Sequence, residues 1–168
     1  MESYQAILGR RSIRQYTGQV IDDQTAEKLV TAGAYAPTAR DLRTNRFLVV
    51  RDREKLAQIT EIMKYGKMIP QAGCVILVYA DRDREPNEYF ANQNASAAIE
   101  NILIAAYGMG LGTVWCGVQG QTAAQIAQVT GCPDHFQPMG LIAVGYPAEE
   151  KPLPERFDPA HLFFETFA

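Results

Sequence analysis

Three arginines and a serine lie within five consecutive positions near the start of the chain, in the stretch GRRSIRQYTG at residues 9–18. The guanidinium groups of Arg10, Arg11 and Arg14 offer planar forks of donors that match phosphate oxygens, and the Ser12 hydroxyl adds a short neutral donor. Basic residues are also favourable at the C-terminus of a helix, where they meet its dipole. The cluster leaves three interpretations open: a solvated helix end, a nucleic-acid patch, or a pocket for one small anion.

The charge balance of the whole chain separates these interpretations. The 168 residues carry a formal net charge of -3, although eight of the eleven arginines precede residue 55. A nucleic-acid binder usually shows a broad basic face and a high pI, whereas the pI here is near 5.4. Local basic clusters in an acidic background favour a small anionic ligand, and we predict no nucleic-acid partner.

Two loops and one isolated cation could also contact a ligand. The stretch YAPTARDLRTNRF at 35–47 breaks a helix at a proline, and such polar loops free backbone groups to touch a ligand. The stretch GMGLGTVWCGVQG at 108–120 surrounds a strand with glycines, which let backbone approach a flat molecule. Each also fits an ordinary explanation, as a helix-to-strand connection or as packing around a core tryptophan. Arg156, after a proline-rich stretch, indicates nothing by itself.

The cysteines and histidines offer little material for metal or nucleophilic chemistry. Cys74, Cys116 and Cys132 form no CxxC pair, and the first two lie in apolar runs typical of buried, inert thiols. His135 and His161 are the only histidines, too few for a usual zinc site or a persuasive Ser-His-Asp triad. We predict no metal site and no catalytic protein nucleophile.

The hydrophobic pattern predicts helices and strands in mixed order within one domain, residues 1–168. The near-continuous apolar run at 74–80 is typical of a strand covered on both faces. Asp22 or Asp23 is a plausible N-cap for a helix that ends at Pro37. The mixed order indicates an α+β fold. Helices are predicted at 3–10, 23–36, 53–65, 87–109 and 122–130, and strands at 46–51, 74–80, 113–118 and 138–144.

Two segments point to a partner subunit. Residues 95–107 are apolar almost all round the helix, so complete burial in a domain of this size calls for a second subunit. Residues 144–168 contain four prolines and end on LFFETFA, which predicts an extended C-terminal segment whose apolar end packs on that partner.

The chain shows no targeting or membrane signal. Residues 1–9 lack a basic n-region and a long apolar core, and the apolar run at 99–111 is too short to span a bilayer. We therefore expect a cytoplasmic protein without membrane contact.

Four motifs in order resemble those of the nitroreductase family of flavin oxidoreductases. RRSIRQY at 10–16 resembles the N-terminal R-R-S-x-R-x-[FY] signature, and AGAYAPTARD at 32–41 is similar to the A-P-S-A-x-N loop. AAIENILIAAYGMGLGTVWCG at 97–117 resembles the pattern of the long helix and following strand. VGYPAEEKPLPER at 144–156 resembles the closing G-Y-P…P-x-x-R.

This resemblance implies an α+β fold with a central, mainly antiparallel sheet flanked by helices. It also implies a homodimer that exchanges its C-terminal tails and holds one FMN at each of two inter-subunit sites. The implied activity is two-step: NADH or NADPH reduces FMN, and a small oxidant such as a nitroaromatic or quinone then takes the electrons. The resemblance leaves the chemistry to FMN, so no catalytic protein residue is implied.

The resemblance also implies roles for individual residues. Arg10 and Ser12, with Arg11 beside them, hold the phosphate and ribityl end, and Arg156 approaches the same phosphate. Arg14 lies near the pyrimidine edge of the flavin, where a fixed cation stabilises the reduced form. Loop and strand residues contact the ring and ribityl chain: Pro37, Thr38, Ala39, Val114, Trp115, Cys116 and Gly117.

The chain departs from the family pattern at several positions. Asp41 and Arg43 replace neutral amides, so Asp41 can only accept hydrogen bonds, and Arg43 could pair with it or select an anionic substrate. Asn94 stands where the family tends to carry aspartate, and the short segment at 80–92 predicts an open site with loose substrate selection. An FMN storage or sensor protein with little turnover remains the alternative.

Overall fold

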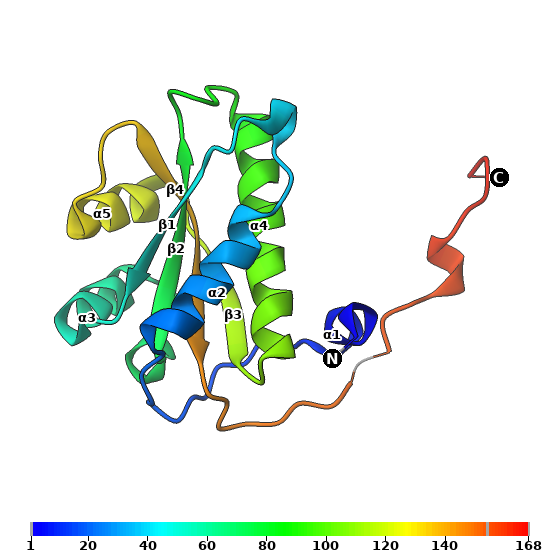
Figure 1. The fold of residues 1–168 in the computed structure, drawn as a ribbon, viewed down its shortest axis with the longest axis horizontal. Helices are drawn as coiled ribbons and strands as arrows, with labels where there is room; N and C mark the ends of the chain where they lie inside the picture. Colours follow the sequence, from blue (N-terminus) through cyan, green and yellow to red (C-terminus); the bar gives the residue numbers. More distant parts are fainter. Residues whose placement is uncertain (1, 154, 168) are drawn as a thin grey trace.

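The centre of the fold is a four-stranded antiparallel sheet. The computed structural model describes residues 2–153 and 155–167. The strands are β1 (Asn45–Val50), β2 (Cys74–Asp81), β3 (Gly112–Gly117) and β4 (Phe136–Gly145), in the spatial order β1-β2-β4-β3. Figure 1 shows helices on both faces of this sheet, and the predicted α+β class is confirmed.

Strand β2 explains why both faces are covered. All eight of its residues are buried. Val75, Leu77 and Tyr79 belong to one apolar cluster, whereas the intervening Ile76 and Val78 belong to another. Because successive side chains of a strand point to opposite faces, the continuous apolar run supplies both cores at once.

Each core is closed by one pair of helices. Residues of α3 (Arg53–Ile62) and α5 (Gly120–Thr130) join the first cluster, and residues of α2 (Asp23–Ala34) and α4 (Glu88–Gly108) join the second. The short α1 (Ser3–Gly9) lies against α4. Helix α3 ends three residues earlier than predicted, because Met63 adopts an extended conformation and Gly66 forms a turn.

Helix α4 is the longest element and packs directly on the sheet. A Cβ at Gly140 of β4 would lie 2.6 Å from Ile99 Cδ1, so glycine lets this side chain of α4 approach the strand without either one shifting. Eight α4 residues are buried within the chain, while Ala97, Ile104 and Ala105 stay half-buried. The predicted burial of this helix is therefore confirmed for one side and incomplete on the other.

The C-terminal segment leaves the body of the molecule after β4. In Figure 1 it runs past α1 and extends away from the sheet. Its large apolar side chains are exposed, from Leu162 at 49 % to Phe167 at 89 %. Within the described chain, no helix has the length and apolar character needed to cross a membrane.

Candidate functional site

The arginine-rich stretch forms an extended arm, residues 10–16, that lies beside the edge strand β3. Ser12 pairs with Thr113 in an isolated parallel bridge, and the Ile13 N–H donates to the Thr113 carbonyl at 2.9 Å. Side chains of an extended segment alternate between two sides. Arg10 and Ser12 accordingly face one cavity, whereas Arg11 and Ile13 face another.

The first of these cavities, the arm cavity, has a volume of about 530 Å³ and gathers six of the predicted site residues. They come from the arm, from β3 and from the C-terminal segment: Arg10, Ser12, Val114, Trp115, Gly117 and Arg156. Its other lining residues were not predicted: Asn92, Leu103, Thr113, Val118, Gln119 and Met139. Thr113, Val118 and Gln119 lie in the glycine-bordered stretch 108–120, whereas no local motif marks Asn92, Leu103 or Met139, which reach the cavity through the packing of α4 and the sheet.

The arm cavity is electrostatically suited to an anion. Arg10 Nε donates to Glu100 Oε1 of α4 at 2.5 Å, which leaves its two terminal nitrogens without a hydrogen-bond partner among the described residues. Nine of the eleven arginine side chains donate to a described carboxylate or carbonyl; within residues 2–153 and 155–167, only Arg14 and Arg156 do not. Positive charge therefore remains available at this part of the surface.

Arg14 lies in a separate cavity of about 390 Å³, the lysine cavity. Lys64 and Lys67 line it too, and no carboxylate is among its described lining residues. Sequence reasoning missed both lysines, because they sit in a short connection after α3 where spacing carries no pattern. The only signal was the pair itself, KYGK, placed just before a buried strand.

Arg11 and Cys116 point away from the arm cavity. Arg11 Nε donates to the Pro152 carbonyl at 3.0 Å, so this side chain fastens the C-terminal segment. The Cys116 side chain belongs to the apolar core on the opposite side of β3 from Trp115. Burial raises the pKa of the Cys116 thiol, which keeps it protonated and unreactive.

The predicted ligand loop lies elsewhere. None of its predicted site residues lines the arm cavity: Pro37, Thr38, Ala39, Asp41 and Arg43. The Ala39 N–H donates to Asn94 Oδ1 at 2.9 Å. On a helix with 3.6 residues per turn, Asn94 points about 200° away from Asn92, which lines the arm cavity. Helix α4 thus separates the loop from the arm within one chain.

The loop is held in a strained conformation. Arg40, Asp41 and Arg43 have φ values of 57°, 53° and 49°, a left-handed region that non-glycine residues rarely adopt. Arg43 donates to both oxygens of Asp41, at 3.2 and 2.9 Å. This pairing lowers the pKa of Asp41, so the carboxylate stays ionised and accepts only.

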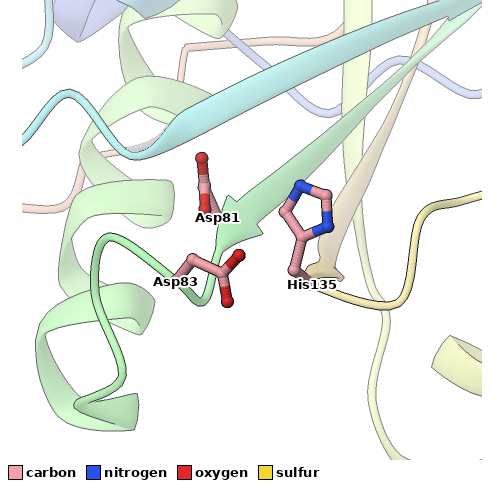
Figure 2. A group of neighbouring side chains, drawn as sticks. All are labelled: Asp81, Asp83 and His135. Carbon is pink, nitrogen blue, oxygen red and sulfur yellow. The ribbon is translucent and has the colours of Figure 1, made fainter.

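The structure also brings together a group that sequence reasoning did not identify. Asp81, Asp83 and His135 place possible ligand atoms within 4.8 Å of one another, at the adjoining ends of β2 and β4 (Figure 2). Asp81 Oδ2, however, accepts from Arg46 Nη2 at 2.7 Å. The carboxylate is already neutralised by a cation, so the group is explained as a charged connection between strands.

Comparison with known proteins gives the family. The model of the Nitroreductase family matches residues 7–66 and 63–146. A protein of Methanothermobacter thermautotrophicus, provisionally named NADH dehydrogenase/NAD(P)H nitroreductase, is 37 % identical over 99 % of this chain and 88 % of its own length. A similarly named protein of Archaeoglobus fulgidus is 36 % identical over 99 % of both chains.

Solved structures agree with this assignment. A structure from Desulfovibrio desulfuricans, provisionally named a nitroreductase and described in complex with FMN, has a TM-score of 0.84. It is 32 % identical, over 100 % of this chain and 99 % of its own. An FMN-dependent nitroreductase from Clostridium difficile has a TM-score of 0.89 at 27 % identity, over 98 % and 99 % of the two chains. With its arm, glycine-bordered β3 and α+β fold, this chain belongs to the nitroreductase family.

Proposed function

We propose that this chain is an FMN-dependent oxidoreductase that accepts a hydride from NADH or NADPH and passes electrons to a small nitroaromatic, quinone or similar oxidant in two half-reactions. The family supports the flavin, and the relatives named NAD(P)H nitroreductase support the electron donor. The observation that carries the proposal is the cavity in which Arg10, Ser12 and Arg156 face β3.

The donors around this cavity fit the phosphate end of FMN. The terminal nitrogens of Arg10 and the guanidinium of Arg156 can each offer a fork of donors to phosphate oxygens. The Ser12 hydroxyl, which hydrogen-bonds to no other described residue, adds a neutral donor. A Cβ placed on Gly117 would meet no atom within 4 Å, so the backbone there is open to a flat ligand.

FMN supplies the redox chemistry when it is bound. The chain supplies position and charge. Arg14, Lys64 and Lys67 place positive charge in the lysine cavity, where we propose that the pyrimidine edge lies. Fixed cations beside that edge stabilise the negative charge that reduction brings. We assign no acid, base or nucleophile to a protein side chain.

The loop at residues 37–43 would reach the cofactor from a second copy. Asn94 holds it on the side of α4 away from the arm cavity, so one chain does not assemble the whole predicted site. The exposed apolar side chains of the C-terminal segment, among them Phe163, Phe164 and Phe167, also favour a partner surface. We propose a homodimer with an FMN at each of two shared sites. Of the predicted segment 144–168, residues 144–152 contact their own chain, and only the exposed apolar end, from Phe157 onward, packs on the partner.

The dimer can be tested by sedimentation with bound FMN. We expect a particle of twice the 18.6 kDa chain mass that carries one FMN per chain. A variant that ends before Phe157 should dissociate and lose FMN together, because the tail holds the partner that completes each site. A full-length monomer that binds FMN at the same stoichiometry would contradict the shared site.

The sequence of the loop at residues 37–43 supports a second candidate function. The Asp41–Arg43 pair occupies positions where the family carries neutral amides, so contacts to an oxidant could be lost while phosphate contacts remain. The second candidate is therefore an FMN storage or sensor protein with little turnover.

Turnover separates the two functions. The FMN-loaded protein should oxidise NADH or NADPH in the presence of a quinone or nitroaromatic, and comparison of the two nucleotides gives the preferred donor. The matched control is the same concentration of free FMN. Oxidation no faster than this control would favour storage, and failure to bind FMN would contradict both functions.

A further inference from the structure

The arm that carries Arg10 and Ser12 is positioned by a second segment far away in sequence. Residues 146–151 form a strap that runs antiparallel to it: Tyr16 pairs with Pro147, and the Ala148 N–H donates to the Gln15 carbonyl at 2.9 Å. The Thr17 N–H donates to the Tyr146 carbonyl at 3.0 Å. The strap therefore begins as an ordinary antiparallel pair.

Two side chains continue this pairing where backbone bonds stop. In an antiparallel register that sets 16 against 147, residue 149 lies opposite 14 and residue 151 opposite 12. Glu149 Oε1 accepts the Arg14 N–H at 2.6 Å, and Lys151 Nζ donates to the Ser12 carbonyl at 2.7 Å. Glu149 and Lys151 also pair with each other at 3.2 Å.

These contacts fix the arm without using the side chains that face the arm cavity. The backbone of Ser12 and Arg14 is held by the strap, and the backbone N–H of Ile13 by β3. Arg10 and Ser12 keep their side-chain donors directed to the cavity. The Arg14 N–H also lowers the pKa of Glu149, as expected for a carboxylate engaged in this bond.

We propose that the Glu149–Lys151 pair is a positioning device for cofactor binding, a latch that holds the arm in the conformation that grips a phosphate. The arm has no helix or ladder of its own: it makes one isolated bridge to β3 and one to the strap. Ordering a backbone segment costs conformational entropy, and a segment ordered before binding spares the ligand that cost. Neither latch residue lines the arm cavity.

The latch rests on the proposed function, and its test compares FMN with riboflavin, which lacks the phosphate. Binding is measured by quenching of flavin fluorescence. Glu149→Ala should raise the Kd for FMN about tenfold, the scale of a lost hydrogen bond to a charged group, and raise the Kd for riboflavin by a smaller factor, because riboflavin has no phosphate for Arg10 and Ser12 and keeps only the contact proposed for Arg14. Glu149→Gln keeps an acceptor for the Arg14 N–H and should restore most of the affinity.

Glu150 provides the matched control, because it carries the same charge one position away and is exposed. Glu150→Gln should leave both affinities unchanged. Lys151→Met tests the other member of the pair, and it should also weaken FMN binding more than riboflavin binding. In the FMN-free protein, amide hydrogen exchange in residues 10–16 should rise about tenfold in Glu149→Ala and not in Glu150→Gln.

The outcomes are distinct. Equal weakening of FMN and riboflavin in Glu149→Ala would overturn the latch, because it would indicate a general loss of structure. Unchanged FMN affinity beside tight wild-type binding would overturn the latch and leave the proposed function intact. Failure of the wild-type chain to bind FMN would overturn the proposed function and the latch together.

Discussion

Replacement of Arg10 by alanine is expected to weaken FMN binding by about 1.5–3 kcal/mol, the contribution of a charge-assisted hydrogen bond. This corresponds to a rise in Kd of about 10- to 150-fold. The effect follows from its position: Glu100 fixes the Nε side of the guanidinium, and the terminal nitrogens remain for phosphate. Flavin fluorescence titration gives the affinity directly.

Arg11 is the matched control for Arg10. It has the same side chain one residue away, but it does not line the arm cavity and donates to the Pro152 carbonyl, although it shares a further cavity with Arg10 and Arg156. Arg11→Ala should change FMN affinity less than about threefold. Arg10→Lys should recover only part of the binding, since an ammonium keeps the charge and loses the fork. Equal losses in Arg10→Ala and Arg11→Ala would mean that the cluster acts only as diffuse charge.

Replacement of Ile99 by alanine is expected to lower the free energy of unfolding by about 2–5 kcal/mol. Ile99 is fully buried on α4, and its Cδ1 fills the space above Gly140 of β4. Its truncation leaves a cavity where the longest helix meets the sheet. Denaturant unfolding of the FMN-free protein measures the change without a contribution from ligand binding.

Ile99→Val is the conservative control, because it leaves a smaller cavity than Ile99→Ala. It removes one methyl group and should cost about 0.5–1.5 kcal/mol. FMN affinity should change little in either variant, because Ile99 does not line the arm cavity. A loss below about 1 kcal/mol for Ile99→Ala would contradict a tightly packed contact between α4 and β4.

The elements of the fold could be predicted from sequence because their patterns are local. The apolar run of β2, with both faces buried, and the Asp22 cap of α2 each follow from a few neighbouring residues. The end of α3 could not be predicted, since Met63 continues the apolar pattern while its backbone leaves the helix.

The site could be predicted only in part. Arg10, Ser12, Trp115 and Arg156 do line one cavity, although they come from distant parts of the chain. The motifs gave no reason to expect Lys64 beside Arg14, or Asp81 beside His135, because folding alone creates those neighbours. The alternation that separates Arg11 from Arg10 required knowing that the arm is extended.

The position of the loop at 37–43 could not be predicted from the sequence for a different reason. Its motif resembles a cofactor-binding loop, yet Asn94 anchors it across α4 from the arm cavity. A relation between two copies of a chain leaves no local pattern in one sequence. The same applies to Glu149, whose role depends on a register set by Tyr16 and Pro147.

The most direct test of the central claim is the rate at which bound flavin is reduced. The FMN-loaded protein is mixed without oxygen with NADH or NADPH, and loss of the visible flavin absorbance is followed in time. We predict reduction at least about a thousandfold faster than for free FMN, and return of the absorbance when a quinone is added. Reduction no faster than that of free FMN would contradict an oxidoreductase.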